Sequence, residues 1–540
     1  EEKTVLKGIT GVASPGRILA VMGPSGSGKS TLLKAIGGRL PDSSSAAFAG
    51  AVLYNDRRKM TKQIRRRTGY VAQHDVLHPH LTVRETLLFC SFLRLPGSTA
   101  KAEKAAAAEA LIRELGLSGC ERTLVGKISG GERKRVSIAQ ELVMDPSVLI
   151  LDEPTSGLDS TAAYGLVRTL RSVAAGGGGK TVVASLHQVS SRGYRMVDDL
   201  LVLSEGRCIY LGKGSEAMNY MEAMGLEPSF PMNPADFLLD LANGRGEDGE
   251  EMADMRQALV ASYTNLLAPT VKSSLPTAAA VDNNSGETAV ATPATWFAHL
   301  AVLLHRNLKQ KRYETLLDPA RLLHVLAGSL LAGSIWWRDG AAEDRLGLLF
   351  FVSVFWGVLP SSAAAFAFPN DRPLFLKERS SDMYSLSSYF AARAVGDLPL
   401  DLILPSLFFL TTYLMTGLKP DVPAFSLSLA VLLLYVLVSQ GVGLAAGALV
   451  PDAKRASTLV TVLMLAFVLA GGYYVRRLPP FMSWIKYLSP VFYCYRLLVY
   501  AQYGDGDAVS GGLNPKACFG VLILMFLTFR VVAYLALARI

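Results

Sequence analysis

Charged residues are scarce in this sequence, and they are unevenly distributed. Only 18% of the 540 residues are Asp, Glu, Lys or Arg, whereas an average soluble domain contains about 25%. Residues 1–315 carry an ordinary density of charge, but long tracts after residue 320 carry almost none. This distribution excludes a wholly soluble protein. The hydrophobic content of 50% excludes a disordered or fibrous one.

Cysteine is also scarce, and a signal peptide is missing. The five cysteines are scattered without a CxxC spacing, which provides neither a zinc site nor a disulfide framework. One bridge between Cys494 and Cys518 stays open, because both fall in a stretch that could lie outside the cytosol. The first 20 residues lack a basic region followed by a long apolar run. We therefore expect the amino terminus in the cytosol.

Acidic residues are outnumbered, since 54 basic residues against 45 acidic ones give a net charge of +9. Nucleic-acid binding is one explanation of such an excess. Much of the excess lies beside apolar tracts, however, and basic residues in that position mark the cytoplasmic side of a membrane. We therefore expect membrane lipids as partners and no nucleic acid.

Residues 1–245 alternate short apolar runs with helical stretches. Helices are predicted, for example, at 102–115 and 161–174. Runs rich in β-branched residues are typical of buried parallel strands, and they lie at 18–22, 69–72, 147–151, 181–185 and 200–203. The pattern predicts an α/β nucleotide-binding domain over residues 1–245.

The second half of the chain is predicted to contain a linker, a connecting helix and a membrane domain. Residues 246–295 lose periodicity and gain small polar residues, which predicts a flexible linker. Residues 296–316 alternate apolar with basic residues, as an amphipathic connecting helix on a membrane face does. Residues 317–540 are predicted to form an all-α transmembrane domain of six spans, each of about 20 mainly apolar residues. The spans lie near 318–337, 344–366, 387–415, 424–450, 455–475 and 516–538.

Two further features of the second half concern an aromatic segment and the orientation of the chain in the membrane. The aromatic segment 480–503 is only partly apolar, which predicts short helices outside the membrane or re-entering it. If the six spans cross the membrane in turn, basic residues near 306–312, 377–379 and 454–455 lie on the side of the amino terminus, whereas Arg338, Arg476 and Arg477 lie on the other side. Because such residues are enriched on the cytoplasmic side, both termini and the nucleotide-binding domain are expected in the cytosol.

A phosphate-binding loop follows the first predicted strand. Residues 23–31 fit G-x-x-x-x-G-K-[ST] between a strand and a helix, where glycines let backbone N–H groups surround a phosphate. Lys29 is expected to reach the β- and γ-phosphates of ATP, and Ser30 to ligate Mg²⁺. The candidate nucleotide-binding residues of this loop are Gly23, Ser25, Gly26, Gly28, Lys29, Ser30 and Thr31.

A second strand, residues 148–151, ends in two carboxylates. Asp152 suits a water-mediated hold on Mg²⁺, and Glu153 suits a general base that polarises the attacking water. Paired acids at a strand end can be ordinary surface residues. The phosphate-binding loop in the same domain favours the catalytic interpretation.

A third segment opens a helix and offers further N–H groups to a phosphate; its residues are Ser129, Gly130, Gly131 and Glu132. Together with the two preceding segments, it resembles the ATP-binding cassette (ABC) ATPases. The resemblance implies that this signature segment completes the ATP site of the opposite subunit. It also implies that Gln73 contacts Mg²⁺ and senses the membrane domain, that Asp159 lies at the dimer seam, and that His187 contacts the γ-phosphate.

The order of the domains, with the ATPase first and six spans second, resembles the ABCG half-transporters. Motifs typical of that subfamily lie at 82–86, 233–237 and 375–390. A half-transporter requires a second half, so we expect a dimer, and specifically a homodimer. Arg393 and Asp397, four residues apart, are expected to form a structural pair at the membrane edge, with a coupling role as the alternative.

The membrane half resembles plant abscisic acid exporters of this subfamily, on the residues at 346–360, 466–475 and 492–496. The resemblance implies ATP-driven export of abscisic acid, a small amphipathic molecule, across the plasma membrane. Two alternatives stay open. One is export of a sterol, a lipid or a cuticular precursor, and the other is an ATP-gated channel or a regulatory subunit.

The same resemblance implies which residues contact the cargo. They are apolar and aromatic residues with one hydroxyl in the slot, which suits a small and mostly apolar molecule. Plain helix packing or lipid contact is the alternative for each. No Lys or Arg is among them, so an anionic cargo would be held by hydrogen bonds or as its neutral acid. The expected set is Phe351, Phe355 and Val358 facing Thr461, Leu465 and Val468, with Tyr473 and Tyr474 as a plug.

Overall fold

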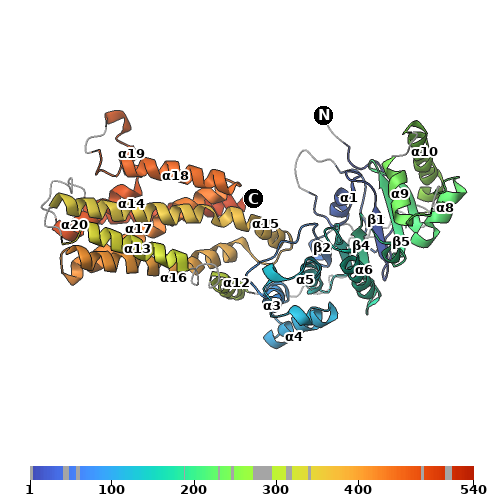
Figure 1. The fold of residues 1–540 in the computed structure, drawn as a ribbon, viewed down its shortest axis with the longest axis horizontal. Coiled ribbons are helices and arrows are strands. Elements are labelled where there is room, and N and C mark those ends of the chain that lie inside the picture. The colour runs from blue at the N-terminus through green and yellow to red at the C-terminus, as the bar shows by residue number, and fades with distance from the viewer. Residues whose placement is uncertain are drawn as a thin grey trace. The chain divides into compact units, whose positions relative to one another are not determined.

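The chain divides into two compact units in the computed structural model (Figure 1). The N-terminal unit comprises Glu1–Thr295 with Ser380–Met383, and the C-terminal unit comprises Trp296–Arg379 with Tyr384–Ile540. Each unit is described by itself. The structure describes residues 4–40, 48–55, 61–187, 189–228, 231–244, 249–269, 271, 295–311, 319–338, 342–475, 479–504 and 514–539.

The described part of the N-terminal unit is built on a six-stranded sheet of order β2-β3-β4-β1-β5-β6. Its strands are β1 (Ile18–Met22), β2 (Thr68–Val71), β3 (Val148–Leu151), β4 (Thr181–Ser185), β5 (Asp199–Ser204) and β6 (Arg207–Lys213). The first five match the predicted apolar runs and pair in parallel. They are almost wholly buried, as continuous apolar runs in a sheet covered on both faces should be.

Strand β6 was not predicted from the sequence. It pairs antiparallel with β5 across Glu205 and Gly206, whose φ angles are 46° and 79°. Two consecutive left-handed residues form the tight turn that joins neighbouring antiparallel strands. The sheet is therefore mixed, with its antiparallel strand at one edge.

Helices surround this sheet. Several begin with a side-chain cap: Thr82 and Ser129 each form a capping box, and Asp159 and Asn233 accept hydrogen bonds from the first turn. The helices are α1 (Lys29–Ile36), α2 (Lys62–Arg66), α3 (Val83–Arg94), α4 (Lys101–Glu114), α5 (Gly130–Leu142), α6 (Ser160–Ala175), α7 (Ser191–Tyr194), α8 (Ala217–Ala223) and α9 (Pro234–Asn243). The carboxyl ends of the parallel strands gather the loops that precede α1, α6 and α7.

The predicted flexible linker over 246–295 is wrong in its first part. Residues Gly249–Ser262 form helix α10, and Tyr263–Leu267 continue it as a π-helical turn. Leu259 and Tyr263 are buried, and the Tyr263 hydroxyl donates to the carbonyl of Thr10. This burial and this hydrogen bond order a stretch whose small polar residues suggested a linker. Residues 272–294 of the predicted linker lie outside the described residues.

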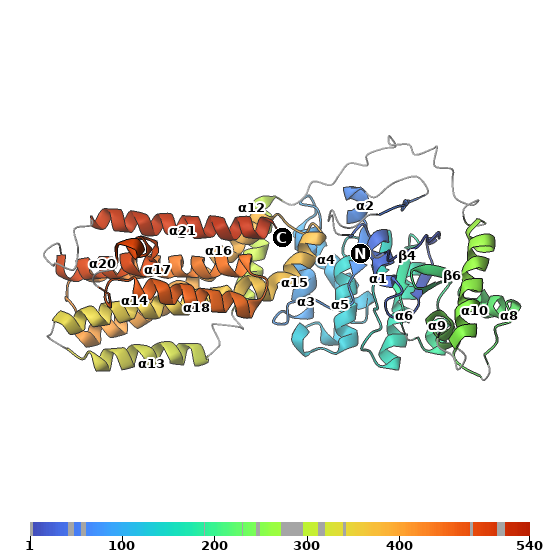
Figure 2. The same ribbon diagram turned by 90° about the horizontal axis from the view of Figure 1, so that it is seen from above.

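The C-terminal unit is helical, and its long helices run side by side (Figure 2). They are α12 (Trp296–Lys311), α13 (Pro319–Ile335), α14 (Ala342–Ala365), α15 (Ala367–Ser380), α16 (Leu386–Thr416), α17 (Val422–Leu449), α18 (Ala453–Leu469), α19 (Ile485–Leu488), α20 (Pro490–Tyr503) and α21 (Pro515–Ala538). The predicted all-α membrane domain is confirmed. Helix α12 covers the predicted connecting helix to Lys311, and residues 312–316 lie outside the described ones.

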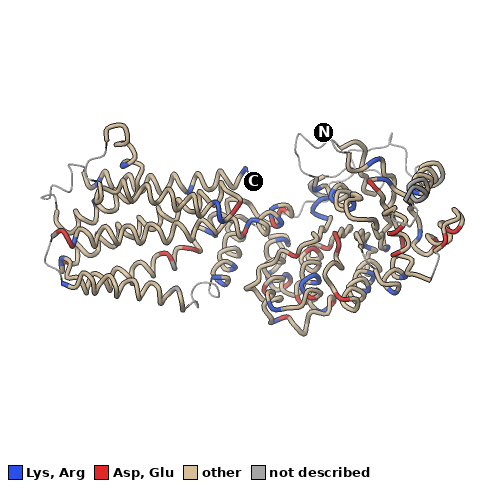
Figure 3. Tube along the Cα trace, turned by 45° about the horizontal axis from the view of Figure 1, so that its top comes forward, with Lys and Arg blue, Asp and Glu red and all other residues tan. Residues whose placement is uncertain are grey.

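A helix occupies each of the six predicted spans. Within the described residues, four helical stretches are long and apolar enough to cross a membrane, namely Glu343–Ser380, Leu386–Thr416, Val422–Leu449 and Pro515–Ala538. Helices α13 and α18 are shorter, with 17 residues each. Lys, Arg, Asp and Glu are sparse along the long helices and frequent in the N-terminal unit (Figure 3).

The segment 480–503 does not form only short helices outside the bundle. Helix α20 has 14 residues, of which Val491, Cys494 and Leu498 are completely or almost completely buried, and it packs against α14, α17 and α21. This packing matches the alternative of a segment that re-enters the membrane domain. Cys494 and Cys518 are both buried and free, so the bridge that the sequence left open is not formed.

The predicted pair of Arg393 and Asp397 is present, but it is not the closest contact. Arg393 Nε lies 3.7 Å from the Asp397 carboxylate, and Arg393 Nη1 lies 2.7 Å from Asp371 of α15. Lys311 of α12 also pairs with Asp397. The four residues thus form one charged cluster that joins α12, α15 and α16.

Candidate functional site

The loop between β1 and α1 needs glycine at three positions. Gly23, Gly26 and Gly28 have φ angles of 149°, 82° and 99°, which side chains rarely adopt. A Cβ atom at Gly23 would clash with the carbonyl oxygen of Leu203, and one at Gly28 would lie 2.7 Å from Leu6. The predicted phosphate-binding loop therefore has the compact backbone that the motif requires.

Lys29 lies inside this loop. Its side chain is buried, and its ammonium group donates to the carbonyls of Gly23 at 2.7 Å and Pro24 at 2.9 Å. Burial lowers the pKa of Lys29, and the negative charges of Glu153 and Asp152 oppose this shift. The buried Ser27 hydroxyl has no hydrogen-bond partner among the described residues. A cation and an unsatisfied hydroxyl at a helix amino terminus fit a polyphosphate.

The two acidic residues after β3 are both bonded by a serine of the neighbouring strand. Ser185 Oγ donates to Asp152 Oδ1 at 2.8 Å and accepts from the backbone N–H of Glu153 at 2.7 Å. Ser30 Oγ donates to the same Asp152 oxygen at 3.1 Å. The predicted Mg²⁺ candidates Ser30 and Asp152 are therefore adjacent. A hydroxyl and a carboxylate are oxygen ligands of the kind that Mg²⁺ prefers.

The predicted base, Glu153, has a left-handed backbone with φ of 45°, which is unusual for a residue other than glycine. Its carboxylate accepts a hydrogen bond of 2.7 Å from Gln73 Nε2. The structure therefore brings Gln73 and Glu153 together. His187 follows β4 and is half-buried, and among the described residues no hydrogen bond joins it to Glu153.

The signature segment forms a tight cap on α5. The Ser129 hydroxyl accepts from the Glu132 N–H at 3.3 Å, and the Glu132 carboxylate accepts from the Ser129 N–H at 2.9 Å and from its hydroxyl at 2.7 Å. These bonds lower the pKa of Glu132. Asp159 caps α6 through Thr161 and Ala162. Ser129 and Gly130 are exposed. Within the described chain, no hydrogen bond joins these residues to the phosphate-binding loop.

Comparisons with known proteins match both units. A family model described as ABC transporter matches residues 6–156, and one described as ABC-2 type transporter matches residues 298–503. ABC transporter G family member 25 of Arabidopsis thaliana is 52% identical, covering 100% of this chain and 88% of that protein. The chain belongs to the G family of ABC transporters. Member 14 of the same plant is 46% identical, and Protein white of Drosophila melanogaster is 31% identical. The match with member 14 covers 100% of this chain and 88% of that protein. The match with Protein white covers 99% of this chain and 83% of that protein.

The predicted resemblance to plant ABCG half-transporters is thereby confirmed. An ABCG half-transporter hydrolyses ATP in its ABC domain and exports a cargo across a membrane. The loop around Lys29 and the carboxylates after β3 lie in the unit that carries this ATPase activity.

The expected cargo residues of α14 pack on neighbouring helices. The ring of Phe351 lies 5.6 Å from that of Trp336, and Phe355 stacks on Phe408 of α16 at 4.8 Å. Val358 is half-buried. The two phenylalanines therefore contribute to the packing between helices as well as to any surface of α14.

The expected residues on and after α18 divide between core and surface. Thr461 and Leu465 are exposed, Leu465 by 59%, whereas Val468 lies in the helical core. Tyr473 and Tyr474 lie 4.8 Å and 5.2 Å from the ring of Phe350, which is itself buried. The exposed positions alone are available to a cargo without repacking of the bundle.

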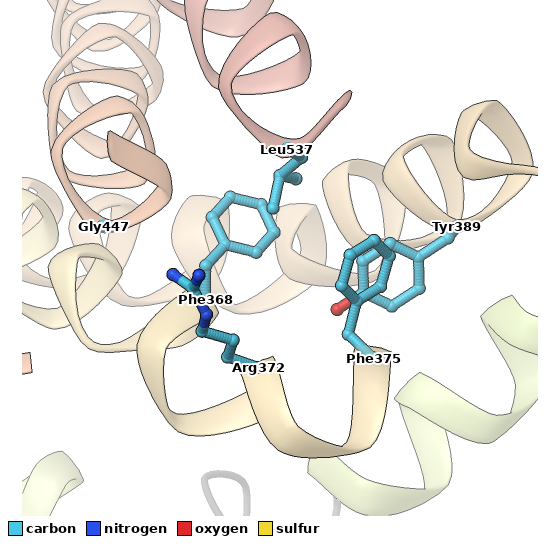
Figure 4. A pocket seen from close by; sticks show the side chains of 6 residues that line it. All are labelled: Phe368, Arg372, Phe375, Tyr389, Gly447 and Leu537. Atoms are coloured by element: carbon cyan, nitrogen blue, oxygen red, sulfur yellow. The ribbon is translucent and has the colours of Figure 1, made fainter. Parts of the chain in front are cut away.

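A small cavity in the C-terminal unit is not a cargo site. It is lined by Phe368, Arg372, Phe375, Tyr389, Gly447 and Leu537, and Figure 4 shows their side chains. Its volume of about 10 Å³ leaves room for about one water molecule. None of the expected cargo residues lines it.

Sequence reasoning missed two residues that organise these sites. Ser185 bonds the Asp152 carboxylate and the backbone N–H of Glu153, and its only sequence signal is a polar residue at the end of the strand that pairs with β3. Phe350 supports Tyr473 and Tyr474; the stretch 346–360 that contains it carried the family resemblance, but nothing in the sequence indicated this packing role.

Proposed function

We propose that this half-transporter exports abscisic acid across the plasma membrane as a homodimer, driven by hydrolysis of Mg²⁺-bound ATP. The observation that carries the ATP-driven part is the hydrogen-bonded set of Ser30, Asp152, Ser185, Glu153 and Gln73. The cargo is supported by the resemblance of the membrane half to plant abscisic acid exporters and by its aromatic residues.

In the proposed hydrolysis, Glu153 takes a proton from the attacking water, and Gln73 and Ser185 hold Glu153 in place. Lys29 and the N–H groups of the loop bind the phosphates, and His187 contacts the γ-phosphate. Ser30, Asp152 and Gln73 would hold Mg²⁺, which supplies charge neutralisation at the phosphates when bound. Three short hydrogen bonds support these roles because they hold the groups in place before a nucleotide arrives: Ser185 bonds the Asp152 carboxylate and the Glu153 backbone N–H, and Gln73 bonds the Glu153 carboxylate.

The dimer is proposed because the family resemblance implies that the signature segment completes the ATP site of the opposite subunit. Ser129, Gly130 and Asp159 are exposed at the starts of α5 and α6. In a homodimer, the signature segment of each subunit would cover the phosphates bound by the other. Two differently tagged copies of this chain should then co-purify from one membrane in the absence of any other half-transporter.

The proposed cargo path uses the exposed side of α18 and the tyrosine pair. Thr461 offers a hydroxyl, and Leu465 and Tyr474 offer exposed apolar and aromatic surface. A small acid with an apolar ring system suits such a surface if its carboxyl is neutral or hydrogen-bonded. A sterol, lipid or cuticular precursor is the second candidate, favoured by the exposed Leu459, Val462 and Leu469 along the same helix.

The test is uptake of radiolabelled abscisic acid into inside-out vesicles that contain the full chain. ATP and a non-hydrolysable analogue are compared for the wild type, Glu153→Gln and the control Glu109→Gln, which alters an exposed carboxylate away from the site. Accumulation is expected with ATP only, in the wild type and the control only. Glu153→Gln should retain ATP binding and lose turnover by roughly 100-fold or more.

The outcomes separate the parts of the proposal. ATPase activity without accumulation of abscisic acid would discard the cargo and direct the search to sterols and lipids. Unchanged ATPase activity in Glu153→Gln would overturn the assignment of the base. An ATP-dependent current that persists in Glu153→Gln would favour a channel.

A further inference from the structure

A buried lysine of α5 contacts the backbone beside Gln73. Lys134 has an exposure of 3%, and its ammonium group donates to the Gln73 carbonyl at 2.9 Å and to the Ala72 carbonyl at 3.5 Å. It also pairs with Asp75 at 3.0 Å. A buried charge is costly unless it is satisfied. These three oxygens satisfy it and tie Lys134 to one loop, the segment that follows β2.

The position of Lys134 along α5 connects two parts of the candidate ATP site. Lys134 lies two residues after Glu132, whose carboxylate completes the cap with Ser129. The Gln73 side chain donates to Glu153 at 2.7 Å. A continuous series of contacts therefore runs from the signature segment through Lys134 and the Gln73 backbone to the carboxylate of Glu153.

We infer that Lys134 is a positioning residue, which ties the start of α5 to Gln73 and so sets the orientation of the Glu153 carboxylate. The inference rests on the proposed role of Glu153 as the base. It assigns a function to a residue whose sequence context suggests only a solvated basic surface, since Lys134 lies in the run Glu132-Arg133-Lys134-Arg135. Any displacement of α5 would be transmitted to Gln73, because the ammonium group holds two successive carbonyls of the loop.

The chain offers a matched control for removal of this lysine. Lys104 of α4 has an exposure of 6%, and its ammonium group donates to a backbone carbonyl, that of Leu95, at 2.9 Å. The described contacts of Lys104 include neither Gln73 nor Glu153. Lys134→Met and Lys104→Met therefore both remove a buried ammonium group that satisfies a carbonyl, and only the first touches the proposed connection.

The experiment measures kcat and KM for ATP in the purified full chain. Lys134→Met is expected to lower kcat roughly 10- to 100-fold, the range seen when a group that orients a metal ligand or catalytic residue is removed. KM for ATP should change less than about twofold, because the phosphate-binding loop is intact. Lys134→Arg should recover part of kcat, and Lys104→Met should leave both constants near those of the wild type.

A double-mutant cycle with Gln73→Ala separates positioning from a purely structural role. If Lys134 acts through Gln73, Lys134→Met should cost nothing further in the Gln73→Ala background. The milder Asp75→Asn removes the ion pair and keeps the side-chain shape. It should lower kcat in the wild-type background and change kcat no further in the Gln73→Ala background. This variant provides the test if Lys134→Met does not fold.

Additive losses in the cycle, or a higher KM at unchanged kcat, would overturn the inference. A normal kcat in Gln73→Ala would also overturn it, because the connection would then have no effect on the base. These results are distinguishable from failure of the proposed function, in which Glu153→Gln itself would retain its turnover.

Discussion

The two units of this transporter build their candidate sites in different ways. In the N-terminal unit, Ser30, Asp152 and Ser185 come from three distant parts of the sequence and meet through hydrogen bonds of 2.8 to 3.1 Å. In the C-terminal unit, Phe351 and Phe355 contact their neighbours through rings that also pack the bundle. A hydrogen bond needs particular atoms in a particular direction, whereas an apolar contact accepts many shapes. In the N-terminal unit, the residues of the candidate site are therefore distinct from those that form the apolar core. In the C-terminal unit, the same residues belong to both.

The described part of the C-terminal unit also contains buried polar contacts, and a buried ion pair is the clearest of them. Arg306 of α12 forms two hydrogen bonds with Glu378 of α15, at 2.6 Å and 3.0 Å, and the Tyr384 hydroxyl donates to the same carboxylate at 2.5 Å. Both charged side chains are almost fully buried. If the helical unit depended on apolar packing alone, this pair would be dispensable.

Arg306→Met tests whether the helical unit depends on this buried ion pair. Among the variants discussed below, it should reduce the free energy of unfolding the most. Removing one partner leaves the Glu378 charge buried without its cation, which should reduce the free energy of unfolding by about 3 to 5 kcal/mol. Denaturant titration of the detergent-solubilised protein measures the change. Arg393→Met, in a more exposed cluster, should cost about 1 kcal/mol or less. Equal losses in the two variants would contradict the prediction.

Two neighbouring residues of α18 should sharpen the distinction between packing and cargo contact. Met464 is buried, so Met464→Ala should cost about 2 to 5 kcal/mol of stability. Leu465 is 59% exposed, so Leu465→Ala should change stability by less than about 0.5 kcal/mol. Leu465→Ala should nevertheless raise the KM for the exported cargo several-fold.

Uptake into inside-out vesicles, together with thermal unfolding, measures both effects for these variants. The control Leu524→Ala alters an equally exposed leucine on α21 and should change neither quantity. A transport defect in the control would show that exposed leucines act through the lipid and not through the cargo.

Ser185→Ala tests whether the polar site in the N-terminal unit depends on one hydroxyl. The variant removes the hydrogen bonds to Asp152 and to the Glu153 amide, and kcat for ATP should fall roughly 10- to 100-fold. Steady-state ATPase assays measure it. Ser204→Ala removes a buried strand-end serine that donates to Ala242 instead. It should leave kcat unchanged, and a similar loss in both would refute the assignment.

Ser129→Ala should reduce the free energy of unfolding by about 1 kcal/mol, the usual contribution of a helix cap. The Ser129 bonds lower the pKa of Glu132 from its ordinary value of 4.5. A lowered carboxylate pKa stabilises the folded state above the ordinary value, and that stabilisation is lost as the pH falls through the folded pKa. The stability difference from wild type should therefore shrink as the pH drops below 4.5.

Unfolding curves at several pH values measure this difference. Thr82→Ala, which breaks the corresponding capping box of α3, should cost about as much stability and leave ATP turnover intact. A stability difference between Ser129→Ala and the wild type that did not shrink below pH 4.5 would contradict the prediction.

The sequence alone determined the parts of this protein that depend on covalent spacing. Gly23 to Thr31 are contiguous, and Asp152 and Glu153 are adjacent, so their chemistry could be predicted before any fold was known. The six apolar segments likewise predicted helices, because their length must match a bilayer. The family resemblance implied that Gln73 contacts Mg²⁺, whereas its hydrogen bond with Glu153 became visible only in the structure.

Only the tertiary structure decided which residues hold those groups in place. Ser185 is 32 residues from Glu153, and Lys134 is 61 residues from Gln73, so neither contact can be read from local spacing. Helix α10 is ordered by the burial of Leu259 and Tyr263, which overrides a weak local pattern. Whether Leu465 is exposed and Val468 buried depends on how α18 is rotated in the bundle. Packing sets that rotation, since both residues are apolar and the sequence pattern cannot distinguish their faces.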